Sequence, residues 1–317
     1  MRRRIVVVNW RRSDLTLRAL RSVLPQMGDG DRLVVVDNGS GDDSTACLRS
    51  PKWDLVETGR NLGFGGGVNA GARGMDEDAL VLLNNDAVAQ DGFLDAITSP
   101  LGGRVGATTG KILLSGTWVQ APPGCADALV AGDGSRWTRT EGGTVLVNST
   151  GNVLDSSGNG SDRDWLEPEG VGDAPAEVFG FCGGACAILR EAWDQVGPFR
   201  EDFFMYYEDT ELSWRLREAG WDIVHVPGAR TVHDHAASSG TNSPMFLRVN
   251  ARNRILVAIL HGPVSMVVQA LARTVGRTLQ GPDRGPVLQG LGEAVARMPR
   301  TLVDRVGRAR GISVGDR

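Results

Sequence analysis

Short apolar runs rich in β-branched residues alternate with helix-compatible segments in the N-terminal part of this chain. Residues 4–9 and 32–36 are such runs, and the segment between them has leucines at helical spacing behind Ser13, which we expect to cap a helix. This βαβ pattern is typical of a parallel sheet with helices on its faces, whose ligand lies beyond the carboxyl ends of the strands. It continues with strands expected at residues 55–57 and 79–83 and helices at 69–75, 92–98 and 210–219.

The composition is that of an ordinary globular protein, with 317 residues, 41% of them apolar and 23% charged. The arginines that follow Met1 run directly into the first predicted strand, so no signal peptide is expected and we predict a cytoplasmic protein. Residues 115–176 are rich in Gly, Asp, Ser and Thr and predict loops and short strands. We expect no nucleic acid among the partners.

Polar residues follow three of the predicted strands, at the point where each strand ends. Asn9 follows the first strand and Asp37 the second, while Asn84, Asn85 and Asp86 follow the run at 79–83. Because the carboxyl ends of parallel strands meet at one edge of a sheet, we expect these side chains to face one crevice. A carboxylate there is suited to hold a hard divalent cation against a diphosphate, although an Asn/Asp turn after a strand is also common.

A glycine-rich segment, residues 61–69, connects the third predicted strand to the helix that follows it. Its glycines would allow backbone amides to approach a phosphate or sugar, so we consider either a nucleotide-sugar cradle or a flexible loop. A dinucleotide-binding fingerprint is rejected, because the segment is the third strand-to-helix connection rather than the first. The candidate donor-binding residues here are Asn61, Gly63, Gly65 and Asn69.

Two adjacent carboxylates, Glu208 and Asp209, follow an aromatic run at the start of a predicted helix. One of them could simply favour the helix N-terminus electrostatically. The other, flanked by apolar rings that raise its basicity, could accept a proton from an attacking hydroxyl.

Taken in order, these motifs, together with Gly183, Gly184 and a later histidine, resemble the GT-A-fold family 2 glycosyltransferases, and especially bacterial rhamnosyltransferase-like members. The resemblance covers about residues 1–255. It implies an α/β fold with a mixed, mostly parallel Rossmann-like nucleotide-binding sheet and flanking helices. We expect a glycosyltransferase domain at 1–245, with a nucleotide-binding half at 1–113 and an acceptor-side half at 114–245, followed by a basic helical extension at 246–317.

The resemblance implies an inverting, metal-dependent sugar transfer with Asp209 as general base, beside Glu208, and Asp86 as a ligand of Mg²⁺ or Mn²⁺. Asn84 stands where the family usually has the first Asp of a DxD motif, which leaves the metal site with less negative charge. His233 is the favoured further metal ligand, with His235 as its competitor, and Arg252 is expected to contact the diphosphate.

The implied donor is a nucleotide-diphosphate sugar, with dTDP-L-rhamnose favoured over UDP-galactofuranose or another hexosyl donor. The acceptor is expected to be a glycan or a lipid-linked saccharide. Two other classes were weighed. A sugar nucleotidyltransferase would need a basic glycine-rich loop where this chain has Asn9 and Trp10, and a non-catalytic glycan-binding protein would not need Asp86 and Asp209.

The chain from Met245 onward is basic, with twelve Arg against four acidic residues. An uncharged run at residues 255–272 precedes most of these arginines and is interrupted by His261, Gly262 and Pro263, which argues against one spanning helix. This part could contact the cytoplasmic face of a membrane peripherally, or it could pack on the main domain or in a homodimer.

Overall fold

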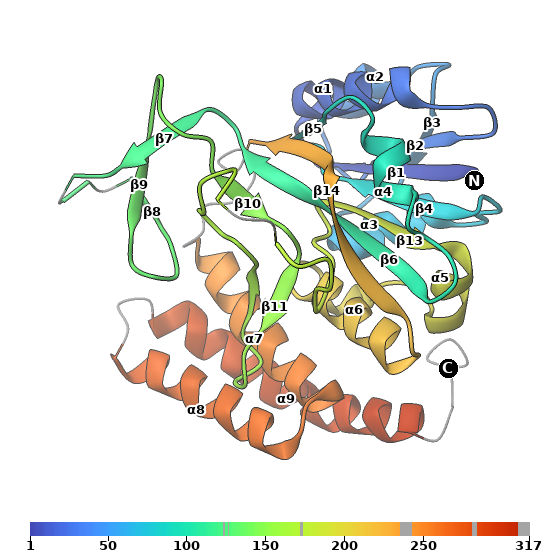
Figure 1. Ribbon diagram of the computed structural model, residues 1–317. Helices are drawn as coiled ribbons and strands as arrows, with labels where there is room; N and C mark the ends of the chain where they lie inside the picture. Colours follow the sequence, from blue (N-terminus) through green and yellow to red (C-terminus); the bar gives the residue numbers. More distant parts are fainter. Residues whose placement is uncertain (123, 126, 172–173, 235–242, 281–283, 310–317) are drawn as a thin grey trace.

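A computed structural model describes residues 1–122, 124–125, 127–171, 174–234, 243–280 and 284–309. Its centre is a nine-stranded mixed sheet with the strand order β3-β2-β1-β4-β13-β6-β14-β5, to which β10 adds by pairing with β6 (Figure 1). The predicted α/β class with a mostly parallel, helix-flanked sheet is confirmed.

Four parallel strands form the N-terminal half of the sheet, as the apolar runs predicted: β1 (Arg3–Asn9), β2 (Arg32–Asp37), β3 (Asp54–Glu57) and β4 (Ala79–Leu83). The strand β13 (Ala185–Leu189) lies antiparallel between β4 and β6 (Val105–Leu114). Next to β6 lie β14 (Asp222–His233), which is parallel to it, and the short antiparallel β10 (Val147–Ser149), while β5 (Ala87–Ala89) pairs with β14 at the edge.

Helices cover both faces of this sheet, because successive strand residues point to opposite sides. Ile5 and Val7 of β1 face the core that includes residues of α1 (Ser13–Val23) and α4 (Phe93–Thr98). Val6 faces the opposite core, which includes residues of α3 (Gly63–Ala72), α5 (Arg190–Val196) and α6 (Glu208–Glu218). The remaining short helices are η1 (Leu24–Gln26), α2 (Ser44–Leu48) and η2 (Glu201–Phe203).

Two details differ from the sequence-based expectations. Ser13 is the first helical residue of α1 rather than its cap, and the residue before it, Arg12, makes no side-chain capping bond. The glycine-rich segment is not a flexible loop, because α3 already begins at Gly63. A Cβ at Gly67 would lie 2.7 Å from Val8, and one at Gly71 would lie 2.7 Å from Val6, so these glycines let α3 pack closely against β1.

The region after β6 contains loops and short strands, as predicted. One small sheet consists of β7 (Thr117–Gln120), β9 (Arg136–Thr140) and β8 (Leu129–Val130), and a second pairs β11 (Asn152–Leu154) with β12 (Gly160–Asp162). In Figure 1 the β7–β9–β8 sheet lies at the left of the molecule, and β11 lies below β10.

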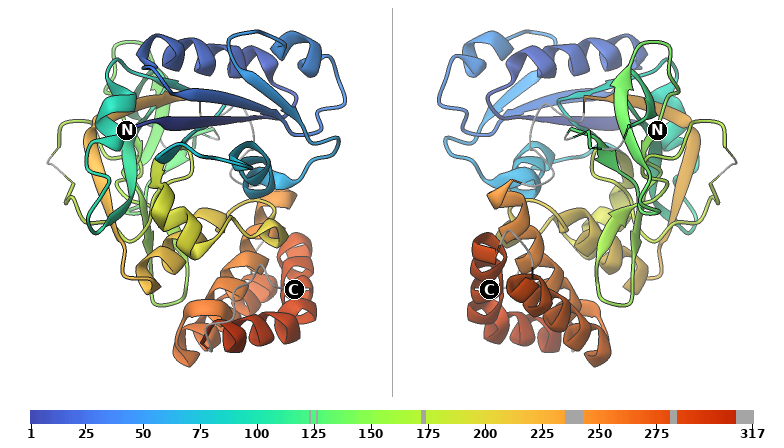
Figure 2. Two further views of the ribbon diagram at one scale, coloured as in Figure 1. Left: turned by 90° about the vertical axis from the view of Figure 1, so that its right-hand side faces the viewer. Right: turned by 90° about the vertical axis from the view of Figure 1, so that its left-hand side faces the viewer.

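The C-terminal part consists of the helices α7 (Pro244–His261), α8 (Val264–Gln280) and α9 (Arg284–Ala309), with the expected break at residues 261–263. These helices gather at one end of the molecule, beside α6 and away from β2 and β3 (Figure 2). α7 is buried along most of its length. Among the described residues, no helix has both the length and the apolar character needed to cross a membrane.

Candidate active site

The polar residues at the ends of β1 and β2 form one hydrogen-bonded cluster. The amide of Asn9 donates to Asp37 Oδ1 at 2.9 Å and to Ser40 Oγ at 3.1 Å, and it accepts a hydrogen bond of 2.7 Å from Thr16. The other oxygen of Asp37 accepts from Thr45 at 3.1 Å. Asn9 and Asp37 are both buried, so this cluster joins the ends of β1 and β2, and the crevice expected there stays a prediction.

The residues after β4 bring distant parts of the chain together. The backbone N–H of Asn84 donates to the carbonyl of Gly184 at 2.9 Å, and the side chain of Asn85 donates to Thr16 at 3.3 Å. Asp86 is buried at the edge of this turn, and the N–H of Asp234 donates to its carbonyl at 3.0 Å. Asn84 and Asn85 therefore connect the β4 turn to β13 and α1.

Asp86 and His233 form a close pair, although they are far apart in the sequence. His233 is the last residue of β14, and its Nε2 lies 2.8 Å from Asp86 Oδ1. Its Nδ1 lies 2.7 Å from the side-chain oxygen of Asn148, which fixes the orientation of the ring and directs Nε2 toward Asp86. A carboxylate and an anchored imidazole that converge on one point are a donor set suited to Mg²⁺ or Mn²⁺.

The pair is not part of a larger cluster of protein ligands. Within the part of the chain that the structure describes, no group of three or more His, Cys, Asp and Glu side chains could hold a metal ion. His235, the alternative ligand, lies outside the described residues. A cation at Asp86 and His233 would therefore take further oxygen ligands from a bound diphosphate or from water, as Mg²⁺ commonly does.

The start of α3 is fixed against the loop that precedes α6. Asn61 Oδ1 accepts a hydrogen bond of 2.8 Å from the N–H of Gly63, and the N–H of Phe64 donates to the carbonyl of Phe204 at 2.8 Å. Gly63 has a φ of +76°, and a Cβ there would lie 1.9 Å from the Phe204 oxygen. Only glycine fits this position, which brings the predicted donor-binding segment against the loop that leads to Asp209.

Gly65 and Asn69 of α3 contact the segment before η2 instead of pointing into open space. A Cβ at Gly65 would lie 2.9 Å from Phe199 Cβ. Asn69 donates to the carbonyl of Phe199 at 2.9 Å and accepts from its N–H at 3.0 Å, and it also lies 3.3 Å from Glu201. In the structure, Gly65 and Asn69 therefore hold α3 against the Phe199 segment.

Asp209 lies in the first turn of α6, facing the glycine pair before β13. Its Oδ2 accepts a hydrogen bond of 3.2 Å from the N–H of Gly183, and its Oδ1 accepts one of 2.7 Å from the N–H of Thr210. Burial raises the pKa of the Asp209 carboxyl, and these hydrogen bonds and one from Asn152 offset part of that rise. Gly183 contacts Asp209 while Gly184 contacts Asn84, so the two predicted motifs meet at this glycine pair.

Two further carboxylates surround Asp209. Glu208 is buried, and both its burial and the neighbouring Asp209 charge raise its pKa well above the ordinary value. Asp162, at the end of β12, has its pKa raised to about 6, chiefly by burial, with the charge of Asp209 raising it and that of His233 lowering it.

Arg252 lies on α7, and its side chain is buried and already engaged. Its guanidinium donates to the Phe203 carbonyl at 2.7 Å and to Glu293 of α9 at 3.0 Å. The neighbouring Asn253 donates to the carbonyls of Phe203, Met205 and Tyr206 at 3.0, 2.9 and 2.7 Å. The Arg-Asn pair thus holds the loop before Glu208, whereas the contact of Arg252 with diphosphate stays a prediction.

That loop has an unusual backbone. Phe204, Tyr206 and Tyr207 all have φ values between 63° and 69°, a left-handed conformation that costs non-glycine residues about 1 kcal/mol or more each. The hydrogen bonds from Asn253 and from the N–H of Phe64 hold the loop in this conformation. The loop in this conformation leads directly into the first turn of α6 and so sets the position of Asp209.

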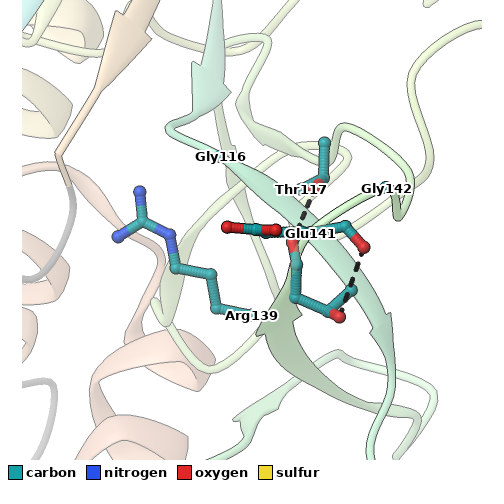
Figure 3. A pocket seen from close by; sticks show the side chains of 6 residues that line it. Gly116, Thr117, Arg139, Glu141 and Gly142 are labelled. Atoms are coloured by element: carbon teal, nitrogen blue, oxygen red, sulfur yellow. Dashed lines mark hydrogen bonds between the residues drawn. The ribbon is translucent and has the colours of Figure 1, made fainter.

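An open hollow of about 540 Å³ lies on the β7–β9 sheet (Figure 3), lined by Gly116, Thr117, Arg139, Thr140, Glu141 and Gly142. It adjoins the Asp86–His233 pair through Ser115. The N–H of Ser115 donates to the His233 carbonyl at 3.0 Å, and Arg139 donates to the Ser115 hydroxyl at 3.2 Å. The hollow thus lies next to the site.

Sequence reasoning missed Asn148 and Asp162. Both come from the irregular region, where no periodicity marks a residue as facing inward. The family resemblance includes the Arg252-Asn253 pair but predicts no role for Asn253, which lies in a helix that is buried nearly all round, so its neighbours give no contrast between faces.

Comparisons with known proteins agree with this geometry. A sequence profile described as "Glycosyl transferase family 2" matches residues 4–114. The chain is 30% identical over 244 residues to an N-acetylglucosaminyl-diphospho-decaprenol L-rhamnosyltransferase of Mycobacterium tuberculosis strain H37Rv, covering 70% of this chain and 72% of the relative.

Solved structures show a similar fold at lower sequence identity. A mannosyltransferase from Pyrobaculum calidifontis, in complex with GDP-Man and Mn²⁺, superposes with a TM-score of 0.53 at 16% identity, over 97% of this chain and 86% of that one. The structure of GalNAc-T7 with UDP, GalNAc and Mn²⁺ gives a TM-score of 0.59 at 15% identity, over 97% of this chain and 58% of that one. At these identities the likeness concerns the fold alone.

Proposed function

The chain belongs to glycosyltransferase family 2, and we propose that it transfers a sugar, with inversion, from a nucleotide-diphosphate donor to a hydroxyl of an acceptor. The observation that carries this proposal is the position of Asp209. Asp209, a carboxylate of raised pKa, accepts a hydrogen bond from Gly183, and the next residue, Gly184, accepts one from Asn84 in the turn that carries Asp86. This supports a base and a candidate metal site on either side of one glycine pair.

In the proposed reaction, Asp209 takes the proton of the acceptor hydroxyl while the hydroxyl oxygen attacks the anomeric carbon of the donor sugar. The bond between that carbon and the diphosphate oxygen breaks on the opposite face, and the nucleoside diphosphate leaves. The raised pKa of Asp209 strengthens it as a base, and the N–H groups of Gly183 and Thr210 hold its carboxylate in place.

Asp86 and His233 are the residues that would hold a divalent cation, and Asn148 would keep the imidazole in position. When bound, Mg²⁺ or Mn²⁺ supplies positive charge that neutralises the leaving diphosphate. The crevice formed by Asn9, Asp37 and the turn at Asn84 and Asn85 would receive the nucleotide.

We further propose that the donor sugar is L-rhamnose, carried by dTDP, and that the acceptor is a lipid-linked saccharide. The support is the name of the mycobacterial relative, whose acceptor is a polyprenyl-diphosphate sugar. Work on such an acceptor would bring the protein to the surface of a membrane. The hollow beside Ser115 and Arg139 adjoins His233 and is a suitable place for the saccharide part of the acceptor.

The test is donor binding and transfer across dTDP-, UDP- and GDP-sugars, each with Mn²⁺ and with a chelator. We expect metal-dependent binding of dTDP-rhamnose. Asp209→Asn should lower the transfer rate by a factor of about 100 or more with donor binding retained, and Asp86→Ala should weaken the metal-dependent binding. Asp222→Asn, whose exposed side chain pairs with Arg104 at the opposite end of β14, is the matched control.

Transfer by Asp209→Asn at the parent rate would refute the base assignment. Use of UDP-galactofuranose in place of dTDP-rhamnose would refute the choice of donor and leave the reaction class intact. Failure of every donor to bind would refute the proposal that the protein uses a nucleotide-diphosphate sugar.

A further inference from the structure

Two stripes of exposed apolar residues run along the last helices. On α8 they follow one another at steps of four or three residues, so they share one face of the helix: Val264, Val268, Ala272, Val275 and Leu279. On α9 the same spacing gives Leu288, Gly292, Val295, Pro299, Leu302 and Val306. Val264 is 76% and Leu279 66% exposed, so these are not residues at the edge of a core.

Both stripes point away from the rest of the protein. On α8, Gln269 contacts Ser156 at 3.1 Å and Arg273 contacts Asp155 at 3.0 Å, which fixes the inward face of the helix. Ala270 and Thr274 of the same helix are fully buried, and Val268 and Ala272 lie two residues before them, which corresponds to a rotation of about 200° around a helix. The α8 stripe therefore lies opposite the buried face of the helix.

The same argument holds for α9. Glu293 pairs with Arg252 at 3.0 Å, and Asp304 pairs with Arg200 at 2.9 Å, so both face inward. Val295 is two residues after Glu293, and Leu302 is two residues before Asp304. The two helices pack against each other and turn their apolar stripes outward on the side remote from the main domain.

Charge is distributed unevenly between the two sides of these helices. α8 has no acidic residue, and the two acidic residues of α9 are the inward-facing Glu293 and Asp304. The exposed charged residues next to the α9 stripe are arginines, Arg284 and Arg300. The outward face is therefore apolar with a positive edge, which complements an anionic bilayer and would repel a second copy of itself.

We infer that the outer face of α8 and α9 is a membrane-docking surface that lies in the plane of an anionic lipid interface. This inference deepens the proposed function, on which it rests for the lipid-linked acceptor, by naming the surface that meets the membrane. Helices with an apolar stripe and a basic edge bind at the boundary between headgroups and acyl chains without spanning the bilayer. The arginines that pair with Asp155 and Glu211 instead fasten the helices to the main domain.

The test is flotation of the full-length protein with vesicles of phosphatidylglycerol and phosphatidylethanolamine, compared with vesicles of phosphatidylcholine alone. We expect binding to the anionic vesicles. The double variant Val268→Glu/Val295→Glu should bind at least about tenfold more weakly, since burial of one valine contributes about the free energy of a tenfold change in affinity. Val119→Glu, at an equally exposed valine of β7, is the matched control and should float like the parent.

Donor binding in solution, without vesicles, separates this inference from the proposed function. Normal donor binding by a parent protein that floats with neither vesicle would overturn the docking surface alone. Equal flotation of the double variant and the parent would also overturn it. A parent dimer in sedimentation experiments that the double variant loses, without vesicle binding, would assign the face to a second copy of the chain instead.

Discussion

Replacement of Asn253 by alanine tests how α7 holds the loop that precedes Glu208 and Asp209. The side-chain amide has two hydrogens, and three carbonyls lie within 3.0 Å of it, so the substitution removes the equivalent of two buried hydrogen bonds. Each buried carbonyl left without a donor costs about 1–3 kcal/mol. The loss of free energy of unfolding would thus be about 2–6 kcal/mol if the loop stayed in place.

The loop will not stay in place, because its left-handed residues are strained. Phe204, Tyr206 and Tyr207 together recover about 3 kcal/mol when they relax, so an unrelaxed loss of about 5 kcal/mol would be measured as a destabilisation of about 2 kcal/mol. A domain with an ordinary stability of about 5–15 kcal/mol remains folded after such a loss. Relaxation displaces Asp209, however, and a shift of about 1 Å at a catalytic group costs about 100-fold in rate.

We therefore expect Asn253→Ala to lower kcat about 100-fold with little change in the affinity for the donor, while urea denaturation shows a loss of about 2 kcal/mol. Asn253→Asp should be at least as damaging, because it keeps the oxygen that accepts from Arg252 and replaces the donor with an acceptor. Asn250→Ala, a half-buried position on the same helix, is the control. A kcat within twofold of the parent, combined with the full loss of stability, would refute the positioning argument.

Three further outcomes follow from the site. Gly63→Ala should abolish donor binding, whereas Gly74→Ala, which also has positive φ but no atom within 4 Å of its Cβ, should cost only about 1 kcal/mol in unfolding experiments. Burial raises the pKa of Asp162 to about 6, above its value in the unfolded chain, so the folded protein loses stability as the pH rises from about 4 through about 6. Asp162→Asn should therefore be more stable than the parent by about 3 kcal/mol at pH 8 in urea denaturation, and the difference should vanish near pH 4. Mn²⁺ titration should show weaker binding by His233→Ala than by the parent in the presence of a nucleoside diphosphate, and equal binding would remove His233 from the metal site.

The parts of the fold that could be predicted are those that the local pattern determines. Valine runs such as residues 32–36 predicted β2 because both faces of a central parallel strand are buried. The polar strand ends, Asn9 and Asp37, were placed in one crevice by the topology alone. The pairing of Asp86 with His233 needed the resemblance to a family, because nothing in the spacing of 147 residues brings them together.

The errors also have physical causes. Glycines are poor helix formers, so the run at residues 63–67 suggested a loop, whereas close packing of α3 against β1 outweighs their low propensity. Serine is a common helix cap, but Ser13 lies one position too late, inside α1. The basic tail left membrane contact and packing on the main domain both open, and two of its arginines, Arg252 and Arg273, pair with Glu293 and Asp155.

The contacts of α7 connect the predicted transferase domain at 1–245 with the predicted helical extension at 246–317. The boundary at residue 245 stays a prediction, but a transferase domain that ended there would lack the amide of Asn253 and the guanidinium of Arg252. The carbonyls of Phe203, Met205 and Tyr206 would then have to find other partners while the loop held its left-handed backbone. The helix that carries Asn253 is also joined, through Glu293 of α9, to the face that we assign to the membrane. Docking at that face and positioning of Asp209 thus depend on the same helical bundle, so a change that loosens the bundle should impair both.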